Sequence, residues 1–142
     1  MSKASDLARL MTSGSTAIHG EAGVTSSGST GLTTNLQQGL CKAWVNYTGV
    51  SSTAARDSFN VSSLTDNATG KTTVNINNDM SNTDYTGYYY TTASTSTGYE
   101  NFGNAFTGGF GSFATGSFGN AAYASGYIDS VRNFCGIFGD LA

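Results

Sequence analysis

The sequence predicts a mainly β protein: a small antiparallel β-sandwich or knob, preceded by a short N-terminal helix and an extended linker. Apolar and polar residues alternate over several short stretches, which is the period of a β-strand. The 142 residues include 19 glycines and no proline, and glycine at this density opposes long helices. Aromatic residues make up 12% of the chain, so it has large side chains to bury, unlike most disordered chains.

The first 39 residues are predicted to form an attachment region. A helix is expected over residues 2–13, where Ser5 is a suitable N-cap and Gly14 a suitable end. A helix this short does not persist alone in water, so we expect it to dock on the body of its own chain, on a sister subunit or on a larger partner. The side chains expected to make this attachment are Leu7, Arg9, Leu10 and Met11. Residues 13–38 are rich in Gly, Ser and Thr, which is typical of an extended linker.

Residues 40–142 are predicted to form the β knob. The first strand is expected over residues 40–47, and its inward positions are Cys41, Ala43, Val45 and Tyr47. Residues 59–64 and 72–76 also alternate, and the turn sequence DNATG lies between them at residues 66–70, which predicts a β-hairpin. Further strands are expected over residues 85–92 and 128–138.

A segment rich in glycine and aromatic residues, 98–127, precedes the last strand. We expect loops or short strands there, because glycine at this density opposes a helix. Aromatic side chains on such loops could stack on sugar rings or fill a partner's pocket; the alternative is that they pack inward as the core of the knob. The candidate recognition residues are Phe106, Phe110, Phe113, Phe118 and Tyr123.

Charge and hydropathy exclude two kinds of partner. Only 11% of the residues are charged and the formal net charge is −3, whereas nucleic-acid binding requires clustered Lys and Arg. No stretch approaches the roughly 20 apolar residues that cross a bilayer, so no membrane insertion is expected. The first ten residues lack the pattern of a signal peptide, which favours synthesis in the cytoplasm.

The sequence predicts no catalytic residues, no metal site and no cofactor. The single histidine, His19, lies in the linker, and the nine carboxylates are dispersed. A specific role for His19 would require three copies to converge on a trimer axis and bind a metal or an anion. Cys41 and Cys135 are either two buried thiols or one disulfide, and the sequence leaves both alternatives open.

A homo-oligomer is expected from the number of strands. Five or six short strands are visible, and the first third of the chain contributes little to a core. Such a chain is marginal as a monomer, and association of several copies would complete its core.

Four short segments resemble a module of phage tail fibres and small phage structural proteins. They are residues 42–47 (KAWVNY), 56–67 (RDSFNVSSLTDN), 70–75 (GKTTVN) and 138–140 (FGD). The resemblance covers residues 40–92 and 126–142; the segment rich in glycine and phenylalanine is not part of the pattern. It implies a β-rich knob, usually an intertwined homotrimer, at a fibre tip or on a particle surface, and it implies no catalytic residues.

Three functional hypotheses are considered, of which the first two follow from the resemblance and the third belongs to another class of protein. In the first, the chain is a short trimeric tail fibre or tail-tip protein of a bacteriophage virion. Its N-terminus binds other phage structural proteins, and its knob contacts a glycan or protein of the host surface. In the second hypothesis it is a trimeric capsid decoration protein, and in the third a carbohydrate-acting enzyme.

Overall fold

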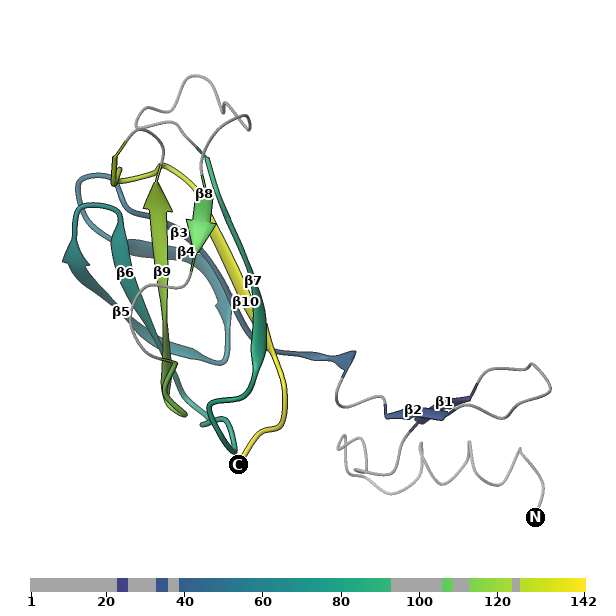
Figure 1. Ribbon diagram of the computed structural model, residues 1–142. Coiled ribbons are helices and arrows are strands. Elements are labelled where there is room, and N and C mark those ends of the chain that lie inside the picture. Colours follow the sequence, from purple (N-terminus) through teal and green to yellow (C-terminus); the bar gives the residue numbers. More distant parts are fainter. Residues whose placement is uncertain (1–22, 26–32, 36–38, 93–105, 109–112, 124–125) are drawn as a thin grey trace, which may run out of the picture. The chain divides into compact units, whose positions relative to one another are not determined.

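The structure, a computed structural model, describes residues 23–25, 33–35, 39–92, 106–108, 113–123 and 126–142. The chain divides into two compact units, Met1–Leu40 and Cys41–Ala142. In the first unit, β1 (Gly23–Thr25) pairs antiparallel with β2 (Thr33–Asn35), as Figure 1 shows. The predicted helix over residues 2–13, with its four attachment residues, lies outside the described residues, and so does His19.

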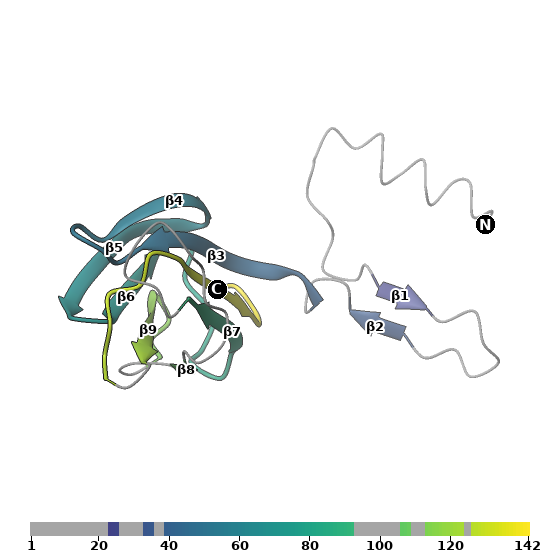
Figure 2. The same ribbon diagram turned by 90° about the horizontal axis from the view of Figure 1, so that it is seen from above.

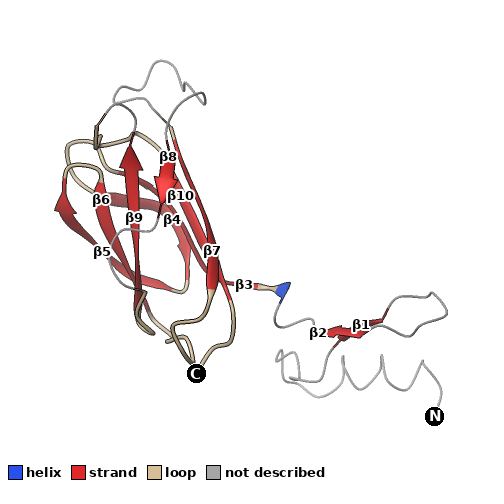
Figure 3. Cartoon of the chain, in the orientation of Figure 1, coloured by secondary structure: helices blue, strands red, loops and turns tan. Residues whose placement is uncertain are grey.

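The second unit is a sandwich of two antiparallel sheets (Figures 1 and 3). The first, called the β3 sheet, has the order β4 (Ala54–Phe59), β3 (Cys41–Thr48), β10 (Asn133–Phe138), β7 (Thr86–Thr91). The second, called the β6 sheet, has the order β5 (Val61–Ala68), β6 (Lys71–Ile76), β9 (Ser117–Tyr123), β8 (Phe106–Gly108). The described residues of this unit contain no helix, so the prediction of a mainly β sandwich is confirmed.

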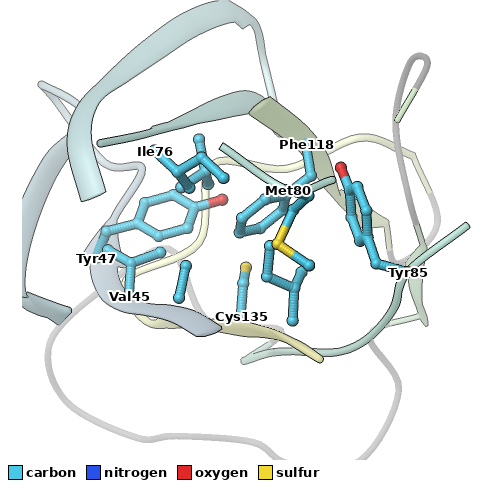
Figure 4. Packing of buried hydrophobic residues seen from close by; sticks show 10 residues of the cluster. Val45, Tyr47, Ile76, Met80, Tyr85, Phe118 and Cys135 are labelled. Atoms are coloured by element: carbon cyan, nitrogen blue, oxygen red, sulfur yellow. The ribbon is translucent and has the colours of Figure 1, made fainter. Parts of the chain in front are cut away.

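The core lies between the two sheets. The predicted alternation in β3 is confirmed for Ala43, Val45 and Tyr47, which are all at most 2% exposed. Facing them from the β6 sheet are Val74 and Phe118, both fully buried. Figure 4 shows these side chains and their neighbours converging between the layers. Burying each large apolar side chain contributes about 1.5–3 kcal/mol, so this cluster holds the sheets together.

The predicted hairpin is confirmed as β5 and β6. Its turn is tighter than expected, because Ala68 already pairs with Lys71 and only Thr69 and Gly70 remain in the turn. Gly70 has a positive φ of 67°, which glycine adopts without strain. Its backbone N–H donates to the Asp129 carboxylate at 2.7 Å, and its carbonyl accepts from the Ala122 N–H at 2.8 Å. The turn is therefore fixed to the rest of the sandwich.

Asn60 carries the chain from one sheet to the other. The sequence placed Phe59 at the start of the hairpin, but Phe59 ends the separate strand β4, and Asn60 follows with a positive φ of 56°. Asparagine tolerates this conformation because its short side chain can bond locally to the backbone. Here its amide donates to the Lys42 carbonyl at 3.0 Å, and its side-chain oxygen accepts from the Asn78 N–H at 2.8 Å. Figure 2 shows β4 and β5 side by side at this edge.

Candidate functional site: an aromatic face on the β3 sheet

The outer side of the β3 sheet carries six aromatic side chains. Because side chains alternate along a strand, burial of Val45, Cys135 and Ile137 turns their neighbours to the outside. In β7 the same alternation exposes the first and third residues of the run Tyr88-Tyr89-Tyr90. The residues that form this aromatic face are Trp44, Phe59, Tyr88, Tyr90, Phe134 and Phe138.

Strand pairing aligns these residues in rows across the sheet. In the first row, Trp44 lies opposite Phe59 on one side and Gly136 on the other, and Gly136 lies opposite Tyr88. A second row runs parallel to it and consists of Asp57, Asn46, Phe134 and Tyr90. Directly opposed residues in neighbouring strands share one face of a sheet. The rows therefore place aromatic groups from all four strands on a single surface.

Gly136 leaves room for the Tyr88 ring. A Cβ atom at Gly136 would lie only 2.5 Å from Tyr88 Cε1, so the ring occupies the space that a side chain would fill. Tyr88 also contacts Phe138, with 6.1 Å between ring centroids and 49° between ring planes. Tyr90 contacts Phe134 in the same way, at 6.2 Å and 43°. In each of these two pairs, one ring therefore packs against the other at a tilt.

The aromatic face is partly exposed. Phe59, Tyr88 and Tyr90 are 53%, 47% and 38% exposed, while the other three rings are half-buried. Single exposed apolar residues are normal, but contiguous exposed apolar patches mark sites of interaction. The aromatic face is therefore the surface of the described residues best suited to bind a partner.

Cys41 also belongs to this face, which corrects the prediction that it faces the core. The pairing register shifts beside Ile137, so that Cys41 lies opposite Phe138 rather than in step with Ala43. The pKa of Tyr88 is raised above its ordinary value, mainly by burial and to a smaller extent by the nearby Cys41 thiol. Both cysteines are free thiols, and Cys135 faces the core on the other side of the sheet.

The structure separates the recognition residues that the sequence grouped. Phe118 is fully buried, so its prediction as a surface residue is wrong: β9 is an interior strand and this ring faces the core. Phe113 and Tyr123 are 39% and 43% exposed. Tyr123 is the last residue of β9, whereas Phe113 precedes the turn at residues 114–117 that leads into the start of this strand. The side chain of Phe106, in β8, and all of Phe110 lie outside the described residues.

Tyr123 belongs to a small cluster of its own. Its ring meets Tyr127 edge to face, with centroids 5.3 Å apart, and Lys71 Nζ lies 4.2 Å from the centroid of the Tyr127 ring. A cation over an aromatic ring is attracted by the ring quadrupole. Tyr127 is 48% exposed, so this end of the sandwich presents aromatic and cationic groups together.

A polar cluster in the core was not predicted from the sequence. The fully buried Asn120 donates to the Tyr47 hydroxyl at 2.7 Å, and its Oδ1 has no hydrogen-bond partner among the described residues. Tyr47 also lines a cavity of about 10 Å³ with Thr72, Ser130 and Asn133. That volume accommodates about one water molecule. The cluster is too small for a substrate, and its polar side chains instead orient the facing strands.

Alkaline pH is expected to destabilise the fold through Tyr47. Burial raises the pKa of this phenol because it disfavours the charged form. Because the pKa is raised in the folded state, Tyr47 makes its full contribution to the free energy of unfolding below about pH 10, which is the pKa of tyrosine in the unfolded chain. This contribution is lost as the pH rises above that value. We expect Tyr47 to lower the free energy of unfolding by about 1.4 kcal/mol per pH unit in this range.

Urea unfolding measured between pH 8 and pH 11 tests this expectation. Tyr47→Phe keeps the ring and removes the ionisable group, so its free energy of unfolding should fall less steeply with pH. Burial also raises the pKa values of Tyr89 and Cys135, so a residual slope will remain. Identical slopes for the two proteins would contradict the role assigned to Tyr47.

Within the described residues, no group of three or more His, Cys, Asp or Glu side chains could hold a metal ion. In that same part of the chain, no helix is long and apolar enough to cross a membrane. Among known proteins, the chain matches no family model, and neither a curated protein nor a solved structure matches it.

Proposed function

We propose that the chain is a structural protein of a bacteriophage virion, a short trimeric tail fibre or tail-tip protein. Residues 1–39 attach it to the tail, and the sandwich is the knob that contacts the host surface. One observation carries the proposal: the four segments of the resemblance are parts of the same sandwich. Residues 42–47 lie in β3, 56–67 span β4 and β5, 70–75 lie in β6, and the FGD segment begins at the end of β10.

The surface chemistry supports binding as the task of this unit. The aromatic face gathers exposed aromatic side chains on one surface, and the buried Asn120 and Tyr47 bond to each other across the two sheets. Three copies on one particle would add avidity, so that weak single contacts still hold the particle on its host. The cluster of Tyr123, Tyr127 and Lys71 is suited to host contact, because aromatic rings stack on sugars and a lysine attracts acidic ones.

Counting copies in purified particles tests the proposal. We expect quantitative mass spectrometry, with the major capsid protein as internal standard, to find this chain in tens of copies per particle. Hundreds of copies would indicate a capsid decoration protein instead. Absence of the chain from particles whose genome encodes it would overturn the virion assignment. As a control, a known tail protein measured in the same digest should keep a fixed ratio to the capsid protein.

A further inference from the structure

We infer that the aromatic face of the β3 sheet is the surface through which copies of this chain associate with one another. The inference rests on the trimer of the proposed function and names the interface that holds it. The observations that carry it are the exposed area of the face, the chemistry of its rings and the exposure of the edge strand β4.

The exposed area is sufficient for a specific contact. A large aromatic side chain offers about 200 Å² when fully accessible. At exposures of 53%, 47% and 38%, Phe59, Tyr88 and Tyr90 together leave about 300 Å² uncovered. The half-buried Trp44, Phe134 and Phe138 bring the patch to about 400–500 Å². In a trimer, three such patches that meet on the three-fold axis together remove about 1,200–1,500 Å², which forms the apolar centre of the contact.

The ring chemistry favours a protein surface over a sugar. Three of the six rings belong to phenylalanine, which offers no hydrogen bond, and every hydroxyl of a bound sugar that loses water needs a partner. The contacting rings are also tilted by 49° and 43°, so they form ridges rather than a flat platform. Ridges of aromatic rings match an equally apolar and uneven surface.

Strand β4 shows where a single copy leaves the sandwich incomplete. All six of its residues are exposed, although alternate residues of a sandwich strand normally face the core. The strand is also an edge of its sheet, and an uncovered edge is open to pairing with another chain. Phe59, the last residue of β4, continues the aromatic face to this edge. A neighbouring copy would cover both features at once.

The distribution of charge favours a second copy as the occupant. The chain carries a net charge of −3, so a contact between two copies is less unfavourable where it brings no further like charges close together. In the two rows of the face, Asp57 is the one charged residue among those described, and it lies at the end of its row beside Asn46. A neutral aromatic centre with a polar margin is the usual anatomy of a protein interface.

Trp44 provides a direct test in the unmodified full chain, because it is the sole tryptophan and lies within the face. We expect sedimentation velocity to show association with rising concentration. Over the same range, the Trp44 emission should shift to the blue and its quenching by acrylamide should fall. Association that leaves the quenching of Trp44 unchanged would overturn the inference, while the trimer of the proposed function would stand. A chain that stays monomeric would overturn both.

Paired substitutions test the same point independently. Phe59→Ser together with Tyr88→Ser should raise the dissociation constant about 100-fold or more, as the loss of central aromatic contacts does. Tyr127→Ser is the matched control, since Tyr127 is 48% exposed but lies outside the face. If the double variant does not fold by circular dichroism, Tyr90→Lys replaces it and places repelling charges in the contact. Equal association of face and control variants would overturn the inference.

Discussion

Replacing Phe118 by alanine is expected to lower the free energy of unfolding by about 3–5 kcal/mol. The ring is fully buried on β9, where its backbone pairs with Val74, and it meets Tyr89 of the opposite sheet with 6.2 Å between centroids. It lies among side chains of both sheets in Figure 4, so its removal leaves a cavity that neither sheet can fill. Urea unfolding followed by circular dichroism measures the loss.

Phe113→Ala is the control for this substitution. Phe113 makes an edge-to-face contact with Tyr85 at 5.3 Å, but it is 39% exposed. Its replacement should therefore cost about 1 kcal/mol. If both variants lose the same small amount, Phe118 does not occupy the core, and the hypothesis of a surface ring would return.

The second large effect is expected at Gly70, where alanine should cost about 3 kcal/mol. A residue with a Cβ is strained by about 1–2 kcal/mol at a φ of 67°. The added atom would also lie 2.7 Å from the Ala122 carbonyl oxygen and 2.8 Å from the backbone of Ile128. These are backbone atoms, so they cannot move aside as a side chain would, and crowding of this kind costs a further 1–3 kcal/mol or so.

Two variants separate strain from crowding at this turn. Gly126→Ala makes the same change where a Cβ would meet nothing within 4 Å, and its stability should change by less than about 0.5 kcal/mol. Gly70→Asn introduces a residue that tolerates positive φ but still carries a Cβ. We expect it to unfold nearly as easily as the alanine variant. Full recovery of stability by asparagine would show that crowding is unimportant.

Three of the strands that could be predicted have one buried and one open face. β3, β6 and β7 alternate in burial, so their sequences carry the period of a strand. β4 was missed because all its residues are exposed, which leaves no alternation to detect. β9 was missed as a core strand for the opposite reason: five consecutive residues, from Phe118 to Ala122, are buried, and four of them are small.

The aromatic face could not be predicted, because it depends on the register between distant strands. Trp44, Tyr88 and Phe134 come from three separate segments, and only the pairing of β10 with both β3 and β7 brings them together. A local signal did exist in the run of three tyrosines at residues 88–90, since one strand cannot bury all three. The register shift that turns Cys41 outward carries no comparable signal in the sequence.

The position of β10 has a consequence for folding kinetics. It is the last strand in chain order, yet it lies between β3 and β7, with Ile137 opposite Ala43. The β3 sheet therefore cannot assemble progressively along the chain, because its central strand pairs across almost the whole unit. Such distant pairings make folding slow, on a scale of milliseconds to seconds. Until β10 pairs with them, β3 and β7 keep unpaired edges, which are open to pairing with another chain.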